Sequence, residues 1–338
     1  MGSLDFNSHA NATQGGRFTA GDFYRAAQER LGLRLLAGED ALHNEVEEPI
    51  IYRPGLALTG FWTSFAAGRV QMLGNAEAAY LNSFDEAERR ERLIALIDHG
   101  ARFFIFTDSH EPTASEIAVA KRKGAVFFVT KLPTRVVARE ATYVLEKLAA
   151  PRTSLYGTMV EVFGMGVLLE GEPGLGKSET ALGLIKHGSA LIADDLTCIR
   201  KDVATNYLFG SAGESTSKFM EIRGIGIINV PRVFGINAVR GEKRLQLVIT
   251  LRHISDLGEK VDRIGNRFDT RRVLDVDIPN IILPVSEGRD LVNLVETAVQ
   301  QQKLVNEGYD PVASLSQRLH ERALANEPKR EQKRRRHG

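Results

Sequence analysis

Short runs of hydrophobic residues alternate with longer amphipathic segments through the first half of the chain. The apolar runs predict strands at residues 50–52, 70–73, 103–107 and 126–129. The amphipathic segments predict helices at residues 23–31, 77–81, 86–99, 115–123 and 134–148. Strands that alternate with helices are typical of an α/β domain with a parallel sheet, so we expect that architecture in residues 18–150.

Polar segments mark the two ends of this domain. Residues 1–17 are rich in serine, asparagine and glycine, and they predict a disordered N-terminus. A linker is expected at Ala150–Thr153, where the pattern changes. Within the domain, Asp108, His110 and Glu111 follow the third predicted strand, and we interpret them as a solvated turn.

A glycine-rich loop lies early in the second domain, which we expect to span residues 151–328. Residues 159–163 and 167–170 predict a hairpin, and a helix is expected at 178–187. The residues between hairpin and helix match the phosphate-binding pattern G-x-x-x-x-G-K-S/T, and we call them the phosphate loop: Gly171, Glu172, Pro173, Gly174, Leu175, Gly176, Lys177 and Ser178. Lys177 would reach the β- and γ-phosphates of a nucleotide, and the Ser178 hydroxyl would bind Mg²⁺. Backbone N–H groups and the start of the helix would attract the phosphate oxygens.

Two acidic residues follow the next predicted strand, at residues 189–193. Asp194 and Asp195 would lie at the end of that strand, where ligands of open parallel sheets bind. One carboxylate could hold Mg²⁺ and the other could accept a proton, because successive side chains of an extended chain point in opposite directions. An ATPase needs only the metal role, whereas a kinase also needs a group that activates or orients the nucleophile.

The pattern alone leaves the role of several other polar segments open. Residues 210–218 are small and polar, and they predict a mobile loop near the site. Residues 221–229 combine a carboxylate, an arginine and two glycines, and a structural loop is as good an interpretation as a site. Arg240 precedes a predicted strand at 245–251. Arg289 stands near the predicted start of a helix, where the helix dipole disfavours a cation, so it could serve a phosphate instead.

The charge of the chain is nearly balanced but unevenly distributed. The 338 residues carry 44 basic and 43 acidic side chains, which gives a net charge of +1. Residues 329–338 hold six basic residues and one acidic residue, so the remaining 328 residues carry a net charge of −4. We therefore expect a mildly acidic folded body with a disordered basic tail, and no strongly basic surface for nucleic acid.

The single cysteine, Cys198, excludes an intramolecular disulfide and any metal site that needs several thiolates. No apolar run approaches the ~18 residues of a membrane span. The first residues also lack the pattern of a secretory signal. We expect a cytoplasmic protein that has no membrane partner.

Taken together, these motifs resemble the HPr kinase/phosphorylase family. The resemblance extends from about Gly21 to Asn326 and rests on GEPGLGKSETALGLIKHG with ALIADD, EIRGIGIINV, PVSEGRDL, and LALTGFWTSFAAGRVQMLGNAEAAYL in the first domain. It implies an enzyme that uses ATP to phosphorylate a serine of HPr, the phosphocarrier protein of the sugar phosphotransferase system. It also implies the reverse reaction, in which inorganic phosphate removes that phosphate and pyrophosphate is released. A hexamer and a P-loop catalytic domain similar to phosphoenolpyruvate carboxykinase are implied as well.

The resemblance further implies roles for individual residues. The phosphate loop would hold ATP, and Ser178 and Glu221 would bind Mg²⁺. Asp194 would be the general base of phosphorylation and the general acid of dephosphorylation, while Arg240 would stabilise the transferred phosphoryl group. A signature segment would serve both reactions: Glu221, Ile222, Arg223, Gly224, Ile225, Gly226, Ile227, Ile228, Asn229 and Val230. A dephosphorylation segment would serve the reverse reaction: Pro284, Val285, Ser286, Glu287, Gly288 and Arg289.

Tyr156 is the main departure from the family pattern, because it stands where the family has a catalytic histidine. Histidine can exchange a proton near neutral pH, whereas tyrosine offers a neutral donor and a bulkier ring. Pro173 lacks an N–H group that could donate to phosphate, and Glu287 would repel phosphate. We therefore expect the kinase reaction to persist and the phosphorolysis to be weak or altered.

Two other functions fit the same residues. The chain could be a P-loop kinase of another substrate, or a nucleotide-sensing regulatory protein with little turnover that binds a partner through its basic tail. Tyr156 favours the sensor. The residues that favour an enzyme are Lys177, Ser178, Asp194, Glu221 and Arg240.

Overall fold

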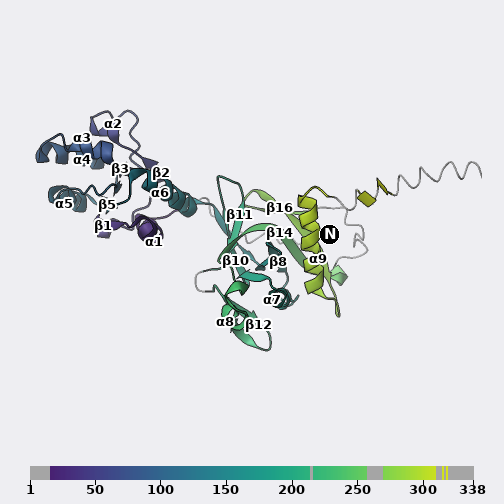
Figure 1. The fold of residues 1–338 in the computed structure, drawn as a ribbon. Coiled ribbons are helices and arrows are strands. Elements are labelled where there is room, and N and C mark those ends of the chain that lie inside the picture. Colours follow the sequence, from purple (N-terminus) through teal and green to yellow (C-terminus); the bar gives the residue numbers. More distant parts are fainter. Residues whose placement is uncertain (1–15, 214–215, 257–268, 310–313, 316, 319–338) are drawn as a thin grey trace, which may run out of the picture. The chain divides into compact units, whose positions relative to one another are not determined.

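The computed structural model describes residues 16–213, 216–256, 269–309, 314–315 and 317–318. The chain forms two compact units, and the division lies between Pro151 and Arg152 (Figure 1). The expected disordered tail at 329–338, and nearly all of the expected disordered N-terminus, lie outside the described residues. Among the described residues, each cluster of buried apolar side chains belongs wholly to one unit.

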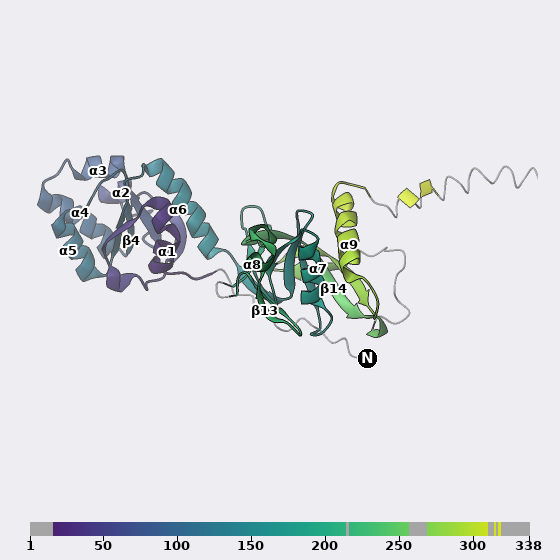
Figure 2. The same cartoon turned by 60° about the horizontal axis from the view of Figure 1, so that its bottom comes forward.

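The first unit is a three-layer α/β fold. A five-stranded sheet in the order β1-β5-β4-β3-β2 lies between two layers of helices (Figure 2). The strands are β1 (Arg34–Ala37), β2 (Glu48–Tyr52), β3 (Arg69–Leu73), β4 (Phe103–Phe106) and β5 (Val126–Val129). The helices are α1 (Ala20–Leu31), η1 (Glu39–Ala41), α2 (Gly55–Leu58), α3 (Asn75–Leu81), α4 (Glu86–Asp98), α5 (Ala114–Lys123) and α6 (Thr134–Ala149).

Alternating side chains of the sheet supply the two cores of this unit. Phe103 and Ile105 face one side, where they pack with apolar residues of α1 and α6. Phe104 and Phe106 face the other side, where they pack with residues of α4 and α5. All four side chains are buried, which explains why β4 reads as an uninterrupted apolar run.

The prediction of a parallel sheet is correct for four of the five strands. β2, β3, β4 and β5 are mutually parallel, and β1 pairs with β5 in the antiparallel direction. The sequence pattern did not indicate β1. Its four residues lie at an edge of the sheet and range from the exposed Arg34 to the buried Ala37, so they give neither a long apolar run nor a clean alternation.

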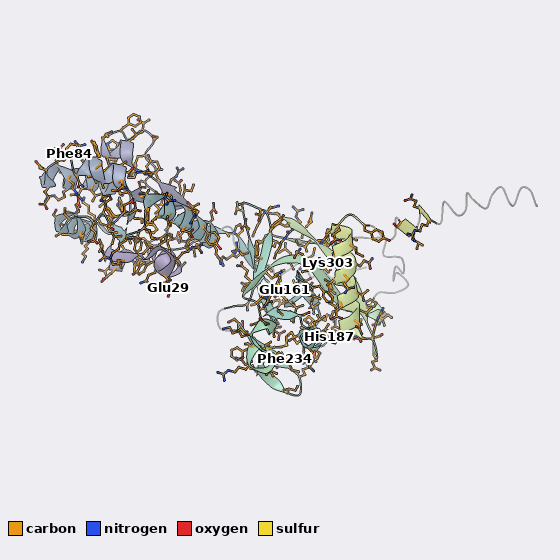
Figure 3. All side chains as sticks on the ribbon, in the orientation of Figure 1. Glu29, Phe84, Glu161, His187, Phe234 and Lys303 are labelled. Atoms are coloured by element: carbon orange, nitrogen blue, oxygen red, sulfur yellow. The ribbon has the colours of Figure 1, made fainter. Side chains whose placement is uncertain are left out.

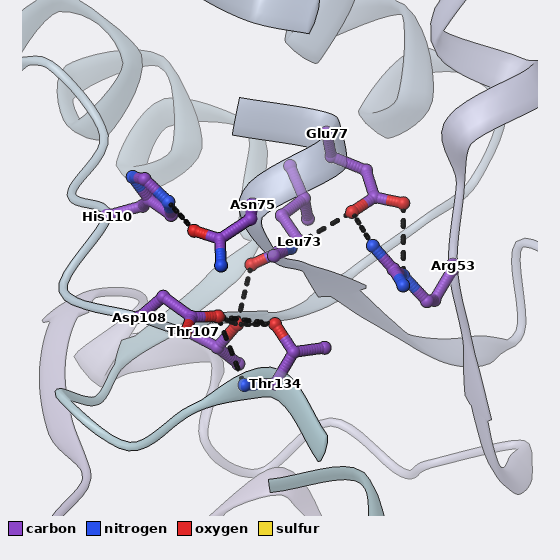
Figure 4. A network of polar contacts seen from close by, with 9 residues as sticks. Arg53, Leu73, Asn75, Glu77, Thr107, Asp108, His110 and Thr134 are labelled. Atoms are coloured by element: carbon purple, nitrogen blue, oxygen red, sulfur yellow. Dashed lines mark hydrogen bonds and ion pairs between the residues drawn. The ribbon is translucent and has the colours of Figure 1, made fainter. Parts of the chain in front are cut away.

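A network of polar side chains joins the carboxyl ends of β3 and β4 to α3 and α6 (Figure 4). Asp108, which follows β4, accepts hydrogen bonds from the Thr134 backbone N–H at 3.0 Å and from the hydroxyls of Thr134 and Thr107. Pro133, the N-cap residue of α6, supplies no side-chain bond, so Asp108 caps that helix from another element. These bonds, that of the Thr134 hydroxyl first, hold the pKa of Asp108 below its ordinary value. Asp108 lies in a turn and is partly exposed, as the interpretation of a solvated turn expects, and the structure adds its role as the cap of α6.

The second unit is built on a nine-stranded sheet in the order β6-β10-β11-β14-β8-β7-β9, in which β16 pairs with β14, and β15 with β16. Its strands, with the separate hairpin β12–β13, are β6 (Arg152–Tyr156), β7 (Thr158–Val162), β8 (Met165–Gly171), β9 (Ala190–Ala193), β10 (Leu196–Lys201), β11 (Leu208–Ser211), β12 (Phe219–Ile222), β13 (Gly226–Asn229), β14 (Glu242–His253), β15 (Asp269–Val273) and β16 (Val276–Val285). Its helices are α7 (Lys177–Lys186), α8 (Val230–Phe234), η2 (Ile236–Ala238), η3 (Ile254–Asp256) and α9 (Leu291–Asn306).

The second sheet contains both parallel and antiparallel strands. The prediction that Asp194 lies at a ligand-binding edge had assumed an open parallel sheet. β8, β14 and β16 are parallel, but β9 pairs in the sheet with the antiparallel strand β7. Because β7 also lies antiparallel to β8, β8 and β9 run in the same direction. The ends of these two strands therefore still meet at one edge, where the phosphate loop and Asp194 follow them.

Two helices cover one face of this sheet, and their close approach depends on a glycine. α7 and α9 pack on the same apolar core, and a Cβ at Gly183 of α7 would lie 2.4 Å from Cγ2 of Val292. His187 contacts Glu296 of α9 at 3.1 Å, and Lys303 of α9 donates to the Phe163 carbonyl at 3.1 Å. Figure 3 labels His187 and Lys303. The packing of Gly183 on Val292 and the contact of His187 with Glu296 hold α7 against α9, and the first turn of α7 carries Lys177 and Ser178 of the phosphate loop.

The structure corrects several local predictions in this unit. β6 begins inside the expected linker, and β11 takes the first two residues of the predicted loop at 210–218, part of which lies outside the described residues. The signature segment forms the hairpin β12–β13 rather than an irregular loop. α9 begins at Leu291 with Asp290 as its N-cap, so Arg289 precedes the helix.

Candidate active site

The phosphate loop joins the end of β8 to the start of α7. Gly171, Gly174 and Gly176 have φ angles of +149°, +92° and +82°, which side chains with a Cβ rarely adopt. Leu175 is buried and anchors the loop in the core. Lys177 folds back over the loop, with Nζ 2.8 Å from the Gly171 carbonyl and 3.0 Å from the Glu172 carbonyl. The loop thus brings an ammonium group and the N-terminus of a ten-residue helix to one place, as phosphate binding requires.

Asp194 connects three elements beside this loop. Its Oδ1 accepts hydrogen bonds from the Ser178 hydroxyl at 3.0 Å and from the Thr158 hydroxyl at 2.8 Å. Its Oδ2 accepts the backbone N–H of Glu221 at 3.2 Å. The structure therefore brings together three residues that the sequence singled out, namely Ser178, Asp194 and Glu221.

Asp195 lies at the apex of a tight turn that separates the two acidic side chains. The Leu196 N–H donates to the Asp194 carbonyl at 2.8 Å, and the φ angle of Asp195 is +66°, which together define a γ-turn. A positive φ at a non-glycine residue costs on the order of 1–3 kcal/mol, and such strain clusters at functional sites. Asp195 is exposed, and no described residue donates a hydrogen bond to its carboxylate.

The signature segment reaches the phosphate loop through Arg223. A Cβ at Gly174 would lie 3.5 Å from Nη1 of Arg223, so this guanidinium lies against the middle of the loop. Arg223 occupies the turn between β12 and β13, whose pairing sets Glu221 opposite Ile227. The hairpin therefore carries both a cation for phosphate and the carboxylate expected to bind metal.

Tyr156 lies beside the acidic pair, at the end of β6. It pairs with Leu196 across the sheet, and the Gly157 N–H that follows it donates to the Asp195 carbonyl at 2.8 Å. The Tyr156 side chain is 69% exposed, so its ring is open to a second protein.

Arg240 lies away from the phosphate loop. Its Nε is 3.5 Å from a carboxylate oxygen of Glu161, and its Nη1 donates to the carbonyls of Asn237 and Val239. Glu161 faces Ala190, the first residue of β9, whereas Asp194 follows the last residue of that strand. The structure thus places Arg240 near the opposite end of β9 from Asp194.

The dephosphorylation segment follows β16 at the same edge of the sheet as the phosphate loop. Leu251 of β14 aligns with Gly171 on one side and with Leu283 on the other, and Pro284 comes next. Arg289 folds back so that Nη1 donates to the Pro284 carbonyl at 3.3 Å. Glu287 and Arg289 are exposed.

Sequence reasoning missed two polar residues at this edge, Thr158 and Glu170. Glu170 ends the apolar run of β8, directly before the loop, and pairs with Arg271 of β15 at 3.3 Å. Burial raises the pKa of Glu170 above its ordinary value, and Arg271 opposes part of that shift. The sequence could have indicated Glu170, because it is a lone carboxylate at the end of an apolar strand. It could not have indicated Thr158, because threonine is common in strands.

The oxygen groups at this site suit Mg²⁺. Among the described residues, no group of three or more histidine, cysteine or acidic side chains is arranged to hold a metal by itself. Mg²⁺ does not need such a cage, since one or two carboxylates together with substrate phosphates are its usual ligands. The Ser178 hydroxyl and the Asp194 carboxylate fit that pattern, and Glu221, whose backbone N–H bonds to Asp194, has a further carboxylate to offer.

Both units of this chain match known protein families. The family described as HPr Serine kinase N terminus matches residues 23–145, and the family described as HPr Serine kinase C-terminal domain matches residues 146–319. The HPr kinase/phosphorylase of Leptospira biflexa serovar Patoc is 38% identical over 86% of this chain and 90% of its own length. The proteins of the same name from Exiguobacterium sp. and Bacillus pumilus are 36% and 34% identical, over 87% and 86% of this chain and 95% and 93% of their own lengths.

A solved structure gives a further comparison. The Hpr(Ser) kinase/phosphatase from Coxiella burnetii shares 33% sequence identity, covers 48% of this chain and 97% of its own, and has a TM-score of 0.44. Among the helices of the described residues, none has the length and apolar character needed to pass through a bilayer.

Proposed function

Because this chain belongs to the HPr kinase/phosphorylase family, we propose that it phosphorylates a serine of HPr with ATP and reverses this reaction with inorganic phosphate, releasing pyrophosphate. The observation that carries the proposal is the convergence of Ser178, Asp194 and the Glu221 backbone beside the phosphate loop. That arrangement supplies a nucleotide site and acidic groups within one small region, as phosphoryl transfer requires.

ATP would bind with its phosphates along the phosphate loop. Lys177 would exchange its bonds to the Gly171 and Glu172 carbonyls for bonds to phosphate oxygens, and Arg223 would add a second positive charge. Ser178 and Glu221 would hold Mg²⁺, which neutralises phosphate charge when it is bound.

The acidic pair would handle the proton of the reacting serine. The family resemblance gives the general-base role to Asp194, and we retain it as the proposal. The bond from Ser178 to Asp194 favours a second assignment, in which Asp194 lies on the metal side and the exposed Asp195 takes the proton. Asp194→Asn and Asp195→Asn separate the two. Loss of turnover with intact Mg²⁺–ATP binding identifies the base, whereas weakened Mg²⁺–ATP binding identifies the metal-side carboxylate.

The arginine assignment also has a direct test. Arg240 would have to leave Glu161 to meet a transferred phosphoryl group, whereas Arg223 already lies at the loop. If Arg240 stabilises the transferring group, Arg240→Ala lowers turnover far more than it weakens ATP binding. If Arg223→Ala lowers turnover and Arg240→Ala does not, Arg223 of the signature segment stabilises the transferred group instead.

The reverse reaction would draw on the dephosphorylation segment. Inorganic phosphate would bind near Arg289, with the side chain released from the Pro284 carbonyl. We further propose a hexamer and a catalytic domain similar to phosphoenolpyruvate carboxykinase, which follow from the family resemblance, and a cytoplasmic location, which follows from the sequence pattern.

Transfer of radiolabel from ATP to purified HPr tests the proposed function. We expect labelling of one serine by the native chain and at least 100-fold slower labelling by Lys177→Ala. Labelling of other proteins but not HPr would favour a kinase of another substrate. Tight ATP binding without any labelling would favour a nucleotide sensor.

A further inference from the structure

Thr158 is held in the sheet with its hydroxyl directed at Asp194. It is the first residue of β7, and its side chain is fully buried. The next residue, Met159, aligns with Ala193 at the end of β9, so Thr158 stands level with Asp194. Its hydroxyl donates to Oδ1 of Asp194 at 2.8 Å. A buried hydroxyl is costly unless it is bonded, and this bond satisfies it.

The segment around Thr158 has little freedom to move. The Gly157 N–H donates to the Asp195 carbonyl at 2.8 Å, and the buried Thr197 hydroxyl donates to the Gly157 carbonyl at 2.9 Å. A Cβ at Gly157 would lie 2.7 Å from the Leu169 carbonyl oxygen, so the chain passes β8 closely at this point. Thr158 is therefore a fixed donor, while Asp194 follows the strand at the start of a turn.

The hydrogen bonds to Asp194 give its two carboxylate oxygens different surroundings. Oδ1 accepts both the Thr158 and the Ser178 hydroxyl protons, which occupy its two lone pairs. Ser178 then keeps its own lone pairs free, as a ligand of Mg²⁺ must. Oδ2 accepts only the Glu221 N–H among the described residues, and it retains a lone pair for a proton or a metal-bound water.

We propose that Thr158 is a positioning residue for phosphoryl transfer, which fixes the rotation of the Asp194 carboxylate and, through it, the Ser178 hydroxyl toward Mg²⁺. Without the Thr158 hydroxyl, Oδ1 loses one of its two donors and the carboxylate can turn about its Cβ–Cγ bond. The Ser178 proton then has no fixed acceptor. This inference rests on the proposed function only for its kinetic readout, since metal-dependent ATP binding can be measured without HPr.

Thr158→Val tests the proposal, because valine keeps the branched shape of threonine and replaces the hydroxyl with a methyl group. We expect the Mg²⁺ concentration for half-maximal ATP binding to rise about tenfold and kcat for HPr phosphorylation to fall at least tenfold, the usual effect of losing a partner that orients a metal ligand. The KM for HPr should stay within twofold, and Thr158→Ser should restore both values to within threefold.

Thr153→Val is the matched control, since Thr153 is also buried in this sheet and its hydroxyl has no hydrogen-bond partner among the described residues. Native Mg²⁺ dependence and kcat in Thr158→Val would overturn the proposal, as would a serine variant that is as impaired as the valine variant. If Thr158→Val does not fold, Thr158→Ala must show the same two losses and Thr158→Ser must reverse them. If the native chain labels no HPr, the proposed function fails, and the Mg²⁺ dependence of ATP binding still decides the role of Thr158.

Discussion

Tyr156 and Leu196 present two exposed side chains beside the acidic pair. They pair across β6 and β10, and both side chains remain open to solvent, with Tyr156 69% and Leu196 40% exposed. A protein substrate that brings its serine to Asp194 or Asp195 would pass over this surface. Tyr156 can therefore contact the substrate, but it lacks the imidazole through which a histidine accepts and donates protons.

This position predicts different effects on the two directions of the reaction. We expect Tyr156→His to raise the rate of pyrophosphate release from phospho-HPr at least tenfold, because an imidazole can supply and accept a proton beside inorganic phosphate. The kinase rate should change less than threefold. Coupled pyrophosphate detection for one direction and radiolabel transfer for the other measure the two rates.

Tyr143→His provides the control, since Tyr143 is an exposed tyrosine on α6 of the first unit. Rapid phosphorolysis by the native chain would contradict the prediction. The same holds if native kinase activity is absent and Tyr156→His restores it.

At the level of single residues, the sequence predicts the site only where spacing fixes geometry. The phosphate loop could be predicted because its glycines, lysine and serine must follow one another at set intervals between a strand and a helix. Thr158 and Arg240 could not be placed in this way. The partner of each side chain depends on which strands become neighbours, and the antiparallel insertion of β7 between β8 and β9 decides both cases.

Among the helices, α6 shows how a distant residue can complete a helix terminus. Asp108 accepts the Thr134 N–H and replaces the side-chain cap that Pro133 cannot provide. The hydrophobic pattern predicted α6 nearly in full, because its apolar stripe is local. Its cap could not be predicted, because Asp108 lies 26 residues away in the sequence.

Asp108→Ala should lower the free energy of unfolding of the first unit by about 1 kcal/mol at pH 7. The pKa of Asp108 is lowered in the folded state, so its bonds stabilise the unit above the unfolded pKa of about 3.9, and this contribution is lost as the pH falls through the folded pKa. The difference between native chain and variant should therefore shrink below pH 4. Urea unfolding followed by Trp62 fluorescence measures it, because Trp62 is the only tryptophan and lies in this unit.

The exposed Asp40 supplies a comparison, since none of the described residues bonds to its side chain. Asp40→Ala should leave the unfolding free energy within about 0.5 kcal/mol of the native value at every pH. An equal loss in both variants would show that the cap of α6 contributes nothing specific.

The packing of α7 on α9 can be tested through Gly183. Gly183→Ala would place a Cβ 2.4 Å from Cγ2 of Val292, and such overpacking costs about 1–3 kcal/mol. We expect a lower unfolding temperature by calorimetry and weaker ATP binding, because α7 carries Lys177 and Ser178. Val292→Ala in the same chain should return most of the lost stability, and additive losses in the double variant would argue against a direct clash.

At the scale of the whole molecule, the charge distribution separates the catalytic body from the C-terminal tail. Residues 329–338 carry +5, lie outside the described residues and follow a body that carries −4. Deletion of residues 329–338 should leave kcat and the KM for HPr within twofold of the native values at physiological salt. Kinase assays of the shortened chain at low and high salt measure this. If the shortened chain is less active than the native chain at low salt but equally active at high salt, the tail binds an acidic partner.

The separate cores of the two units also affect which amino-acid substitutions this chain can accept. Each cluster of buried apolar side chains lies wholly before Ala150 or wholly after Ser154 among the described residues. A substitution in one core therefore demands no compensating change in the other core. A tyrosine at position 156, where the family resemblance implies a histidine, is then a change that the second unit can accommodate without any change in the core of the first unit.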